Sequence, residues 1–348
     1  MEKTDIRSLH YTELEKAFET LLEKKFRAKQ VYDWLHCKQA DDFSEMTNLS
    51  KDLRKKCGDY FDIYTVRPVE ILESQIDGTK KYLFRLHDDH IIESVFMRYE
   101  YGNSVCVSSQ VGCRMGCRFC ASTIDGLNRD LTSGEMLGQI YGIMKETGER
   151  ISHVVVMGSG EPLDNYENFL KFITMLTDEH GLHLSQRNVT VSTCGLAAEI
   201  KRLAEEKLQI TLAISLHAPT DKKRSELMPI TQKYPLAELM EACRYYFDRT
   251  GRRLTFEYSL IGGVNDTPED AAALTGLLRG LNCHINLIPV NPVKERSYIQ
   301  SEREVIRAFK NKLEKNHLNV TVRREMGRDI DGACGQLRRS YMEDTRMC

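Results

Sequence analysis

Three cysteines lie close together in the segment VGCRMGCRFCAS, residues 111 to 122. Cys113, Cys117 and Cys120 form a C-x3-C-x2-C pattern that includes Gly116 and directly follows Gly112. Structural zinc sites use four protein ligands, usually as two separated pairs, which this single compact group does not match. Cubane iron–sulfur clusters do take thiolates from one tight loop, where glycines let the backbone wrap closely. Three thiolates on a four-iron cluster leave one iron free to bind a substrate or cofactor.

Strand and helix signals alternate along most of the chain. Runs typical of strands, each followed by a helical pattern, occupy residues 104–109, 153–157, 189–193, 210–216, 254–260 and 284–289. Thr132 and Glu135 have the spacing of a helix capping box, and further helices are expected over 165–178 and 235–251. Six such units predict parallel strands with right-handed crossovers in an open sheet or an incomplete barrel, with an added edge strand at 318–323.

Short polar motifs follow the ends of these strands. They are GSGEP (158–162), STCG (192–195), SLHAP (215–219) and PVNP (289–292). Because the C-terminal ends of parallel strands lie along one edge of a sheet, these motifs and Cys113 are expected to converge on one mouth.

The cysteine motif, with the aromatic Phe119 before its last cysteine, resembles the signature of radical S-adenosylmethionine (radical SAM) enzymes. The resemblance implies a [4Fe-4S] cluster whose fourth iron chelates the amino and carboxyl groups of S-adenosylmethionine. It also implies that an electron from the cluster splits the sulfonium to give a 5′-deoxyadenosyl radical. A loop of this composition arising by chance is the less favoured interpretation.

The same resemblance gives roles to the polar strand ends. Gly158 and Gly160 allow close backbone approach, and Glu161 can pair with the ammonium group of the cofactor. Further cofactor-binding positions are expected at Ser192, Ser215, Leu216, His217 and Asn291. A single serine or histidine at a strand end is more often satisfied locally, so the expectation depends on their convergence.

The first hundred residues have a different organisation. Residues 10–58 carry helical spacing with a scatter of basic side chains, which suits either an RNA-contacting face or an ordinary solvated one. Residues 68–100 contain short strand-like runs separated by DGT, DDH and YGN, which predicts an antiparallel ribbon.

The whole chain closely resembles the RlmN/Cfr family of RNA (adenine) methyltransferases. The resemblance is carried by RAKQVYDWL (27–35), SVCVSSQVGCRMGCRFCAS (104–122), GSGEPLDNYEN (158–168), VSTCG (191–195), AISLHAP (213–219), MPI (228–230), GVND (263–266), INLIPVNP (285–292) and DIDGACGQL (329–337). It implies an incomplete (β/α)6 barrel with a small N-terminal helical accessory domain that binds RNA. The expected division is 1–65 for that domain, 66–100 for the β-ribbon and 101–348 for the barrel with its C-terminal catalytic loop.

The resemblance also implies catalytic roles for three residues. One S-adenosylmethionine methylates the thiol of Cys334, and a second yields the radical that takes hydrogen from this S-methyl group, so that two are used per turnover. The resulting methylene radical adds to adenine and leaves the RNA covalently bound to Cys334. Glu93 matches the family's proton acceptor, and Cys106 attacks Cys334 to form a disulfide that releases the methylated RNA.

Family members divide by target atom. One branch methylates C2 of an adenosine in 23S rRNA and in certain tRNAs, and the other methylates C8 of the ribosomal adenosine. The sequence FCASTIDGLNRDLT (119–132) resembles the C2 branch. Two positions depart from the familiar pattern, namely Ser159, where some members have methionine, and Gly332, where alanine is usual.

Composition limits the remaining possibilities. The 49 Lys and Arg against 51 Asp and Glu give a net charge of −2, so RNA contacts must come from local patches. The candidate patches are Lys24, Lys25, Arg27 and Lys29, and Arg323, Arg324, Arg338 and Arg339. With no long apolar run and no signal-peptide pattern, we expect a cytoplasmic protein whose 11 cysteines do not form a disulfide framework and which does not engage a membrane. A reductant protein such as flavodoxin or ferredoxin is the expected electron donor. Alternatives are C8 methylation, a non-catalytic iron–sulfur RNA-binding protein, and a zinc-binding module.

Overall fold

A single ten-stranded sheet runs through the molecule. The computed structural model describes residues 3–291 and 297–330. The sheet has the order β14-β13-β12-β11-β10-β9-β6-β5-β4-β3. From first to last along the chain, its strands are β3 (Arg67–Glu73), β4 (Lys80–Arg85), β5 (Ile91–Tyr99), β6 (Gly102–Val107), β9 (His153–Val156), β10 (Val189–Thr193), β11 (Thr211–Ser215), β12 (Leu254–Leu260), β13 (Cys283–Pro289) and β14 (Asn319–Val322).

The six strands expected from the alternating pattern are all present, and β14 is the expected edge strand. Strands β6 and β9 to β14 are mutually parallel, as the series of strand and helix units predicted. The predicted ribbon is also present as β3, β4 and β5, which are antiparallel and extend the same sheet. Because β14 and β3 form its two edges, the sheet stays open.

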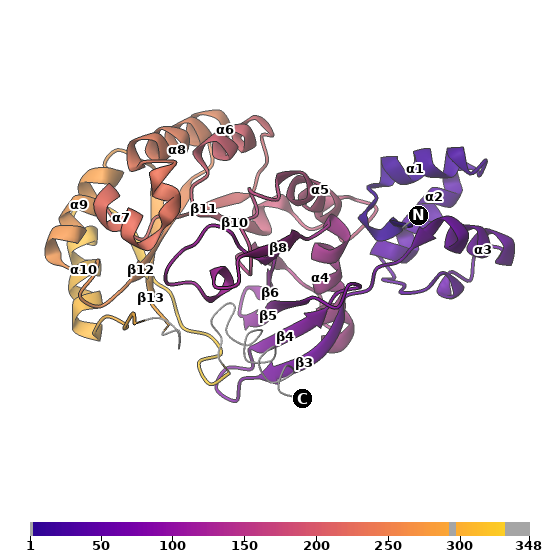
Figure 1. Ribbon diagram of the computed structural model, residues 1–348, viewed down its shortest axis with the longest axis horizontal. Helices are drawn as coiled ribbons and strands as arrows, with labels where there is room; N and C mark the ends of the chain where they lie inside the picture. The colour runs from indigo at the N-terminus through magenta and orange to yellow at the C-terminus, as the bar shows by residue number, and fades with distance from the viewer. Residues whose placement is uncertain (1–2, 292–296, 331–348) are drawn as a thin grey trace.

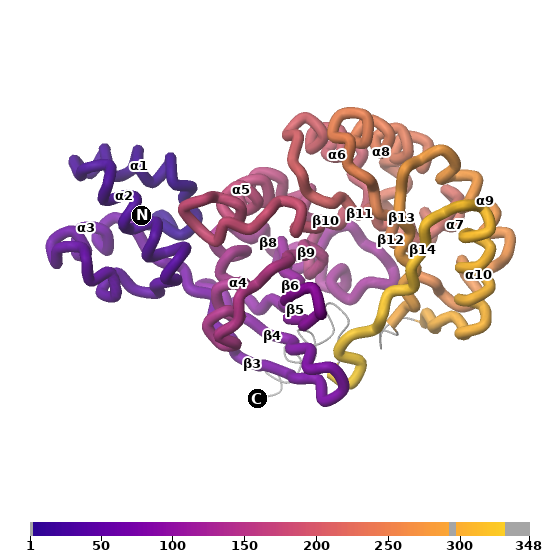
Figure 2. Tube along the Cα trace, turned by 180° about the vertical axis from the view of Figure 1, so that it is seen from behind, coloured from indigo at the N-terminus to yellow at the C-terminus, as the bar shows by residue number. Residues whose placement is uncertain are grey.

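Helices follow the parallel strands and cover the outer side of the sheet, as Figures 1 and 2 show. They are α4 (Ser133–Thr147), α5 (Tyr166–Thr177), α6 (Ala197–Glu205), α7 (Asp221–Leu227), α8 (Leu236–Thr250), α9 (Pro268–Leu278) and α10 (Arg303–Lys315). The predicted capping box is formed at α4, where the Thr132 side chain accepts from Glu135 N and the Glu135 side chain accepts from Thr132 N. Helix α8 ends at Gly251 with φ of 66°, a conformation that glycine adopts without strain.

The first strand ends earlier than predicted. It stops at Val107, and after two residues the chain forms β7 (Gln110–Gly112), which pairs with β8 (Leu127–Asp130) in a separate two-stranded sheet. Gly112 has φ of 80°, and a Cβ there would lie 2.0 Å from the carbonyl oxygen of Gly126. The segment with the three cysteines is therefore a loop closed at its base by a short ladder.

The N-terminal helices are α1 (Tyr11–Thr20), α2 (Lys25–His36) and α3 (Lys51–Tyr60), accompanied by the short parallel pair β1 (Thr4–Asp5) and β2 (Phe61–Asp62). They lie to one side of the sheet and reach it through α4 (Figure 1). Single turns of 3-10 helix occur at Ile6–Ser8, Phe43–Glu45, Ala121–Thr123, Gln186–Asn188 and Pro229–Gln232. The domain boundaries at residues 65 and 100 stay predictions. No helix in the described part of the chain is long and apolar enough to cross a membrane.

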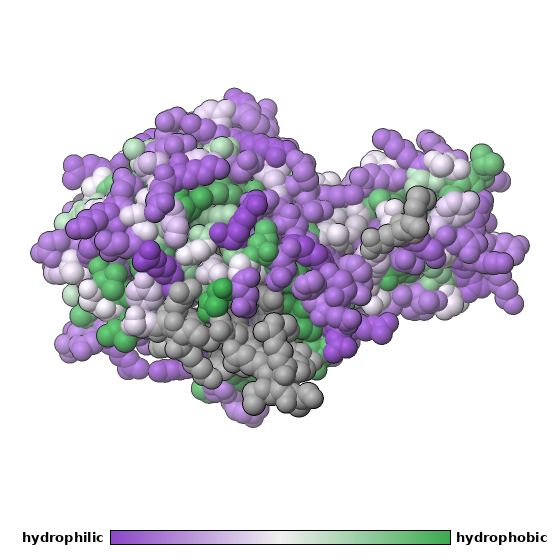
Figure 3. Space-filling view, viewed as in Figure 1, coloured by the Kyte–Doolittle hydropathy of each residue, from purple (hydrophilic) through white to green (hydrophobic). Residues whose placement is uncertain are grey.

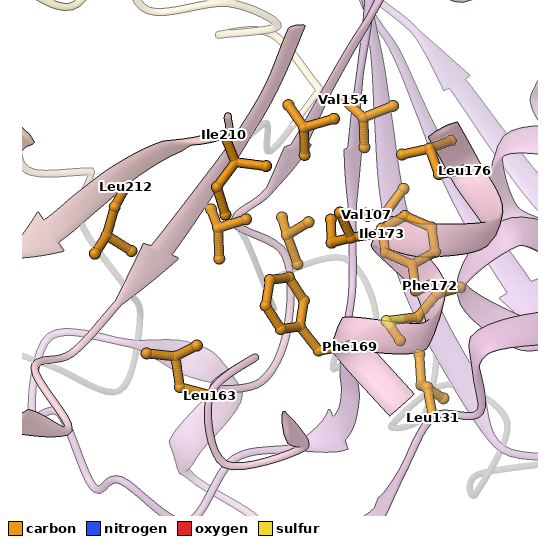
Figure 4. Close-up of a cluster of buried hydrophobic side chains, with 14 of the residues drawn as sticks. Val107, Leu131, Val154, Leu163, Phe169, Phe172, Ile173, Leu176, Ile210 and Leu212 are labelled. Atoms are coloured by element: carbon orange, nitrogen blue, oxygen red, sulfur yellow. The ribbon is translucent and has the colours of Figure 1, made fainter. Parts of the chain in front are cut away.

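Helix α5 shows how the covering helices are held. Phe169, Phe172 and Ile173 are fully buried and point toward Val107 and Val154 of the sheet (Figure 4). Burying one such side chain contributes about 1.5–3 kcal/mol. This packing fixes the level at which β6 and β9 end, and thereby the position of the loops that follow them.

Candidate active site

The loops after the parallel strands enclose a cavity of about 380 Å³. Its lining includes all three motif cysteines and residues from both the ribbon and the parallel strands. Figure 3 shows the same side of the molecule as Figure 1, with apolar residues visible in a recess among polar ones. The predicted convergence of strand ends on one mouth is therefore what the structure shows.

The loop that carries the three cysteines forms part of the cavity wall. Cys113 N donates to the Gly126 carbonyl at 2.8 Å, and Thr123 Oγ1 donates to the carbonyl oxygens of Cys117 and Cys120 at 2.9 and 3.0 Å. The ring of Phe119 packs edge-on against the ring of His217, with 4.8 Å between centroids. Backbone contacts and one aromatic contact thus shape the loop, whose three cysteines all line the cavity.

The electrostatics of these thiols suit a cationic cluster. Burial raises the pKa of Cys113 to about 12, and burial together with the neighbouring thiols raises the pKa of Cys117 further. Three thiolates here would therefore need compensating positive charge, which iron would supply. Among the described residues, no three Cys, His, Asp or Glu side chains converge closely enough to bind one metal ion. A cubane cluster does not require this, because each thiolate binds a different iron atom.

A fourth cysteine, Cys194, also lines the cavity. Its backbone N donates to Glu161 Oε2 at 2.6 Å, and its carbonyl accepts from Arg224 at 2.6 Å. Burial and the Glu161 carboxylate raise the pKa of its thiol well above the usual range. Cys194 is thus tied through its backbone to Glu161 and Arg224 just after the end of β10.

Glu161 is fixed by the backbone around it. Besides Cys194 N, its carboxylate accepts from Leu163 N at 3.1 Å, while burial raises its pKa. The glycines before it are pressed against the chain itself, since a Cβ on Gly158 or Gly160 would lie 2.7 Å from the backbone of residues 107–110. Gly158 thus approaches the end of β6 and Gly160 the start of β7, which holds the carboxylate at the cavity wall.

Ser159 links this motif to the cysteine loop. Its hydroxyl lies 3.0 Å from that of Ser122, two residues after the last motif cysteine, and its N–H donates to Ser108 Oγ. A methionine at this position could form no hydroxyl contact with Ser122. The other departure from the family pattern, Gly332, lies outside the described residues.

His217 has a defined protonation state. Its Nδ1 accepts from Ser259 N at 3.0 Å, and burial lowers its pKa to about 3. The ring is therefore neutral near pH 7 and carries its proton on Nε2, which makes it a hydrogen-bond donor at the cavity. Ser192 and Ser215 lie beside it on the same edge, with their hydroxyl oxygens 3.2 Å apart.

Glu93 lines the cavity from β5 and is paired with a lysine that the sequence did not single out. Lys81 Nζ lies 3.4 Å from Glu93 Oε2, and the two side chains are 0% and 2% exposed. Ser108 Oγ donates to the Glu93 carbonyl at 2.7 Å, which ties β5 to the end of β6. A buried carboxylate beside the cysteine loop is a suitable group to accept a proton.

Cys106 lies on β6 within the same cavity and forms no disulfide with any cysteine that the structure describes. Burial raises its pKa to about 11, and the positive charge of Arg323 opposes this shift. Its predicted partner, Cys334, lies outside the described residues, as do Arg338 and Arg339. The disulfide between the two cysteines stays a prediction.

The structure brings most of the sequence-predicted site residues together. Around the one cavity lie Glu93, Cys106, Cys113, Cys117, Cys120, Gly160, Glu161, Ser192, Ser215, His217 and Asn291. Leu216 is not among them, because its side chain is buried in the core and its N–H donates to the Glu257 carbonyl at 3.0 Å. The individual roles of all these residues stay predictions.

Arg224 is a second residue that the sequence did not reveal. It is fully buried and donates to the carbonyl oxygens of Cys194, Ser215 and Leu216, and to Thr231 Oγ1. Burial lowers its pKa. One guanidinium thus holds the ends of β10 and β11 in register, since its planar fork can reach several acceptors at once.

The open parallel sheet with a three-cysteine loop at its C-terminal edge defines a class of proteins. The Radical SAM superfamily matches residues 107–275, and the Ribosomal RNA large subunit methyltransferase N-terminal domain matches residues 4–63. A radical SAM methyltransferase from Sphaerobacter thermophilus has a similar structure, with a TM-score of 0.91, 42% identity, and coverage of 96% of this chain and 98% of that one. The fold is the partial barrel of the radical SAM enzymes, whose cofactors are a [4Fe-4S] cluster and S-adenosylmethionine.

Sequence relatives narrow the class. The chain is 62% identical to a probable dual-specificity RNA methyltransferase RlmN from Lachnospira eligens, over 98% of this chain and 97% of the relative. It is 53% identical to the protein of the same description from Clostridium novyi, over 92% of this chain and 94% of that protein. The chain belongs to the RlmN family of radical SAM RNA methyltransferases.

Proposed function

We propose that this protein methylates C2 of adenosine in 23S rRNA and in certain tRNAs, with two S-adenosylmethionine molecules used for each methyl group transferred. The observation that carries the proposal is the shared cavity. The cluster loop, Glu161, Glu93 and Cys106 come from four separate segments and all line it. A structural cluster alone would need only the loop, whereas methyl transfer to carbon needs the other groups as well.

Different residues of this chain are proposed to carry out different steps of the reaction. When bound, the cluster and S-adenosylmethionine supply a carbon radical, which acid–base groups cannot generate. Cys334 carries the methyl group as a thioether and then holds the RNA covalently through the new carbon bond. Glu93 accepts the proton that leaves the adenine ring as the adduct gives up one electron, which the oxidised cluster would accept. The thiolate of Cys106 then attacks the sulfur of Cys334 and breaks the carbon–sulfur bond, so that a disulfide forms, the released carbon takes up a proton to become the methyl group, and the methylated RNA leaves.

RNA binding is assigned to two basic regions. Arg323 and Arg324 are exposed and line the cavity, where they can contact phosphates next to an unstacked base. Lys24, Lys25 and Lys29 are exposed on the N-terminal helices, although Lys25 is paired with Glu19 at 2.9 Å. A small acidic flavoprotein or ferredoxin is the proposed source of electrons, and the reaction is proposed to occur in the cytoplasm.

The deciding experiment is mass spectrometry of RNA after incubation with the reduced, iron-reconstituted protein and methyl-labelled S-adenosylmethionine. The proposal expects 2-methyladenosine in both rRNA and tRNA. Labelled 8-methyladenosine instead would place the protein in the C8 branch. A preparation that forms neither product and no 5′-deoxyadenosine would refute the proposal.

Two variants test the division of work. Cys106→Ala is expected to accumulate a covalent protein–RNA adduct, because the adduct forms but is not resolved. Cys334→Ala is expected to form no adduct at all. Denaturing gel electrophoresis with labelled RNA distinguishes the two, and wild-type behaviour of both variants would favour a non-catalytic RNA-binding protein.

A further inference from the structure

Strand β12 lies between β11 and β13 and borders the cavity. None of the sequence-predicted site residues belongs to this strand. The predicted cofactor positions follow β9, β10, β11 and β13, at Glu161, Ser192, Ser215 and Asn291. A ligand that extends from Ser215 to Asn291 must therefore pass over β12. Two side chains of β12, Glu257 and Ser259, line the cavity there.

Glu257 occupies a fixed place in a polar row across the sheet. It is in register with Ser215 on β11 and with Asn286 on β13. Asn286 Nδ2 donates to Glu257 Oε1 at 2.9 Å, and Thr321 Oγ1 donates to Asn286 Oδ1 at 2.6 Å. The backbone is held too, because the Glu257 carbonyl accepts from the N–H of Leu216 and of His217.

The other carboxyl oxygen of Glu257 is not satisfied by the part of the chain that the structure describes. Glu257 is 4% exposed, and its Oε2 has no hydrogen-bond partner among residues 3–291 and 297–330. Leaving a buried polar group without a partner is strongly unfavourable, and more so for a charged one. Burial raises the pKa of Glu257, which Asn286 and the charge of Arg323 oppose. A bound ligand with a donor group would remove this penalty, whereas an acceptor would repel the carboxylate.

The neighbours of Glu257 indicate which donor. Paired positions on adjacent strands lie about 4.8 Å apart, so the carboxylate and the hydroxyl of Ser215 face the cavity side by side. A vicinal diol presents two hydroxyls at adjacent carbons, one able to donate to a carboxylate while the other exchanges a hydrogen bond with a serine. An ammonium group could donate to both side chains as well, but the carboxylate expected to pair with the ammonium group of the cofactor is Glu161.

We propose that Glu257 Oε2 accepts a hydrogen bond from a ribose hydroxyl of a nucleoside bound in the cavity. This inference rests on the proposed function, which places two nucleosides here, namely the cofactor and the target adenosine of the RNA. Both carry the same ribose chemistry, and the experiment below distinguishes them. Glu257 would then be a ligand-binding residue on β12, a strand for which the sequence predicted no site residue.

The test uses the reconstituted holoenzyme and equilibrium dialysis without RNA. The probes are S-adenosylhomocysteine and its 2′-deoxy and 3′-deoxy analogues, and the variants are Glu257→Gln and the surface control Glu241→Gln. If the ribose belongs to the cofactor, one deoxy analogue binds the wild type roughly 10- to 100-fold more weakly. Glu257→Gln loses a similar factor for S-adenosylhomocysteine and does not discriminate against that analogue, while Glu241→Gln behaves as wild type.

A second comparison, with RNA, tests whether the ribose belongs to the target adenosine instead of the cofactor. If cofactor affinity is unchanged, a short RNA hairpin is compared with the same hairpin carrying 2′-deoxyadenosine at the target position, and only the wild type should prefer the former. No effect of either ribose on either protein overturns the inference and leaves the proposed function standing. A wild type that binds no S-adenosylhomocysteine overturns the proposed function and this inference with it. If Glu257→Gln does not fold, Glu257→Asp, which withdraws the carboxylate from the ligand, takes its place in the same comparisons.

Discussion

The side chains of Lys81 and Glu93 are both ionisable, and both are buried away from water at the edge of the cavity. The effective desolvation penalty is several kcal/mol for each ion, and their attraction repays it only with good geometry. The 3.4 Å separation and near-zero exposure of both side chains describe such a pair. A buried ion pair is weak support for stability by itself, so stability alone does not account for a carboxylate in the lining of this cavity, and the role of Glu93 as proton acceptor stays a prediction.

Replacing Lys81 with methionine should destabilise the protein by about 3–5 kcal/mol, because it leaves the buried carboxylate without this partner. Lys38→Met is the matched control, since Lys38 pairs with Asp33 at 3.1 Å with both side chains about half exposed. Its loss should be at most about 1 kcal/mol. Urea denaturation measures both values.

The double variant Lys81→Met/Glu93→Gln separates the pair from its surroundings. If the pair accounts for the loss, the second substitution should recover part of the stability, because no buried charge remains. Losses that simply add would show that Lys81 stabilises the ribbon through packing, independently of Glu93.

At the scale of the elements, the strands and their ends were predictable because their signals are local. Apolar runs, a capping box and a glycine stop each depend on a few neighbouring residues, and the cysteine spacing is itself local. Lys81, Arg224 and Glu257 were missed because their burial depends on which distant strands lie beside them. Nothing in KKYLFR or LTFEYSL states which charged side chain will face a cavity.

Two glycines that share a positive φ but differ in their neighbours test how tightly the strand ends are joined. Gly160 has φ of 111°, and a Cβ there would lie 2.7 Å from Gln110 N, whereas Gly251 has φ of 66° and nothing within 4 Å. Gly160→Ala should therefore cost about 2–5 kcal/mol from clash and backbone strain together. Gly251→Ala should cost about 1 kcal/mol.

The midpoints of urea denaturation and the iron content per chain are measured for both alanine variants and the wild type. Gly160→Ala should also reduce iron incorporation, because Gln110 lies at the base of the cysteine loop. Equal losses of stability for the two alanine variants would mean that the GSGEP turn and β7 can move apart to accommodate the added methyl group.

The contact between α2 and α4 should weaken in acid. His36 Nδ1 lies 2.8 Å from Tyr141 Oη, and burial lowers the His36 pKa to about 3. The unfolded chain takes up a proton near pH 6.5 and the folded chain does not, so stability is full above that pH and falls as pH drops toward 3. Between pH 7 and pH 5 this one histidine should remove about 2 kcal/mol.

Denaturation at both pH values compares the wild type with His36→Gln, which cannot take up the proton. The variant should lose about 2 kcal/mol less than the wild type over this interval, even if it starts from lower stability. The exposed His317, changed to asparagine, should keep the wild-type difference. An unchanged pH dependence in His36→Gln would show that His36 is protonated in the folded protein.

At the scale of the whole molecule, charge is arranged locally rather than globally. The net charge of −2 offers no general attraction to RNA, yet the N-terminal helices expose Lys24 and Lys29. Leu22, two residues before Lys24, and Phe26, between the two lysines, are 93% and 51% exposed. Basic side chains interspersed with exposed apolar ones suit a surface that contacts phosphates and unpaired bases together. This surface lies on a unit that is joined to the barrel mainly through α4 (Figure 2).

Reversing two of these charges, with Lys24→Glu/Lys29→Glu, should weaken RNA binding and flatten its salt dependence. Each lost phosphate contact lowers the slope of log affinity against log salt by about 0.7–0.9, so the double variant should lose up to about two units of slope. Lys312→Glu/Lys315→Glu, in the last turn of α10, carries the same change of net charge away from this surface. Fluorescence anisotropy with a labelled RNA hairpin over a salt series measures the slope. Equal slopes for the two charge-reversal proteins would remove the N-terminal helices from the RNA interface and leave Arg323 and Arg324 at the cavity mouth as the main phosphate contacts.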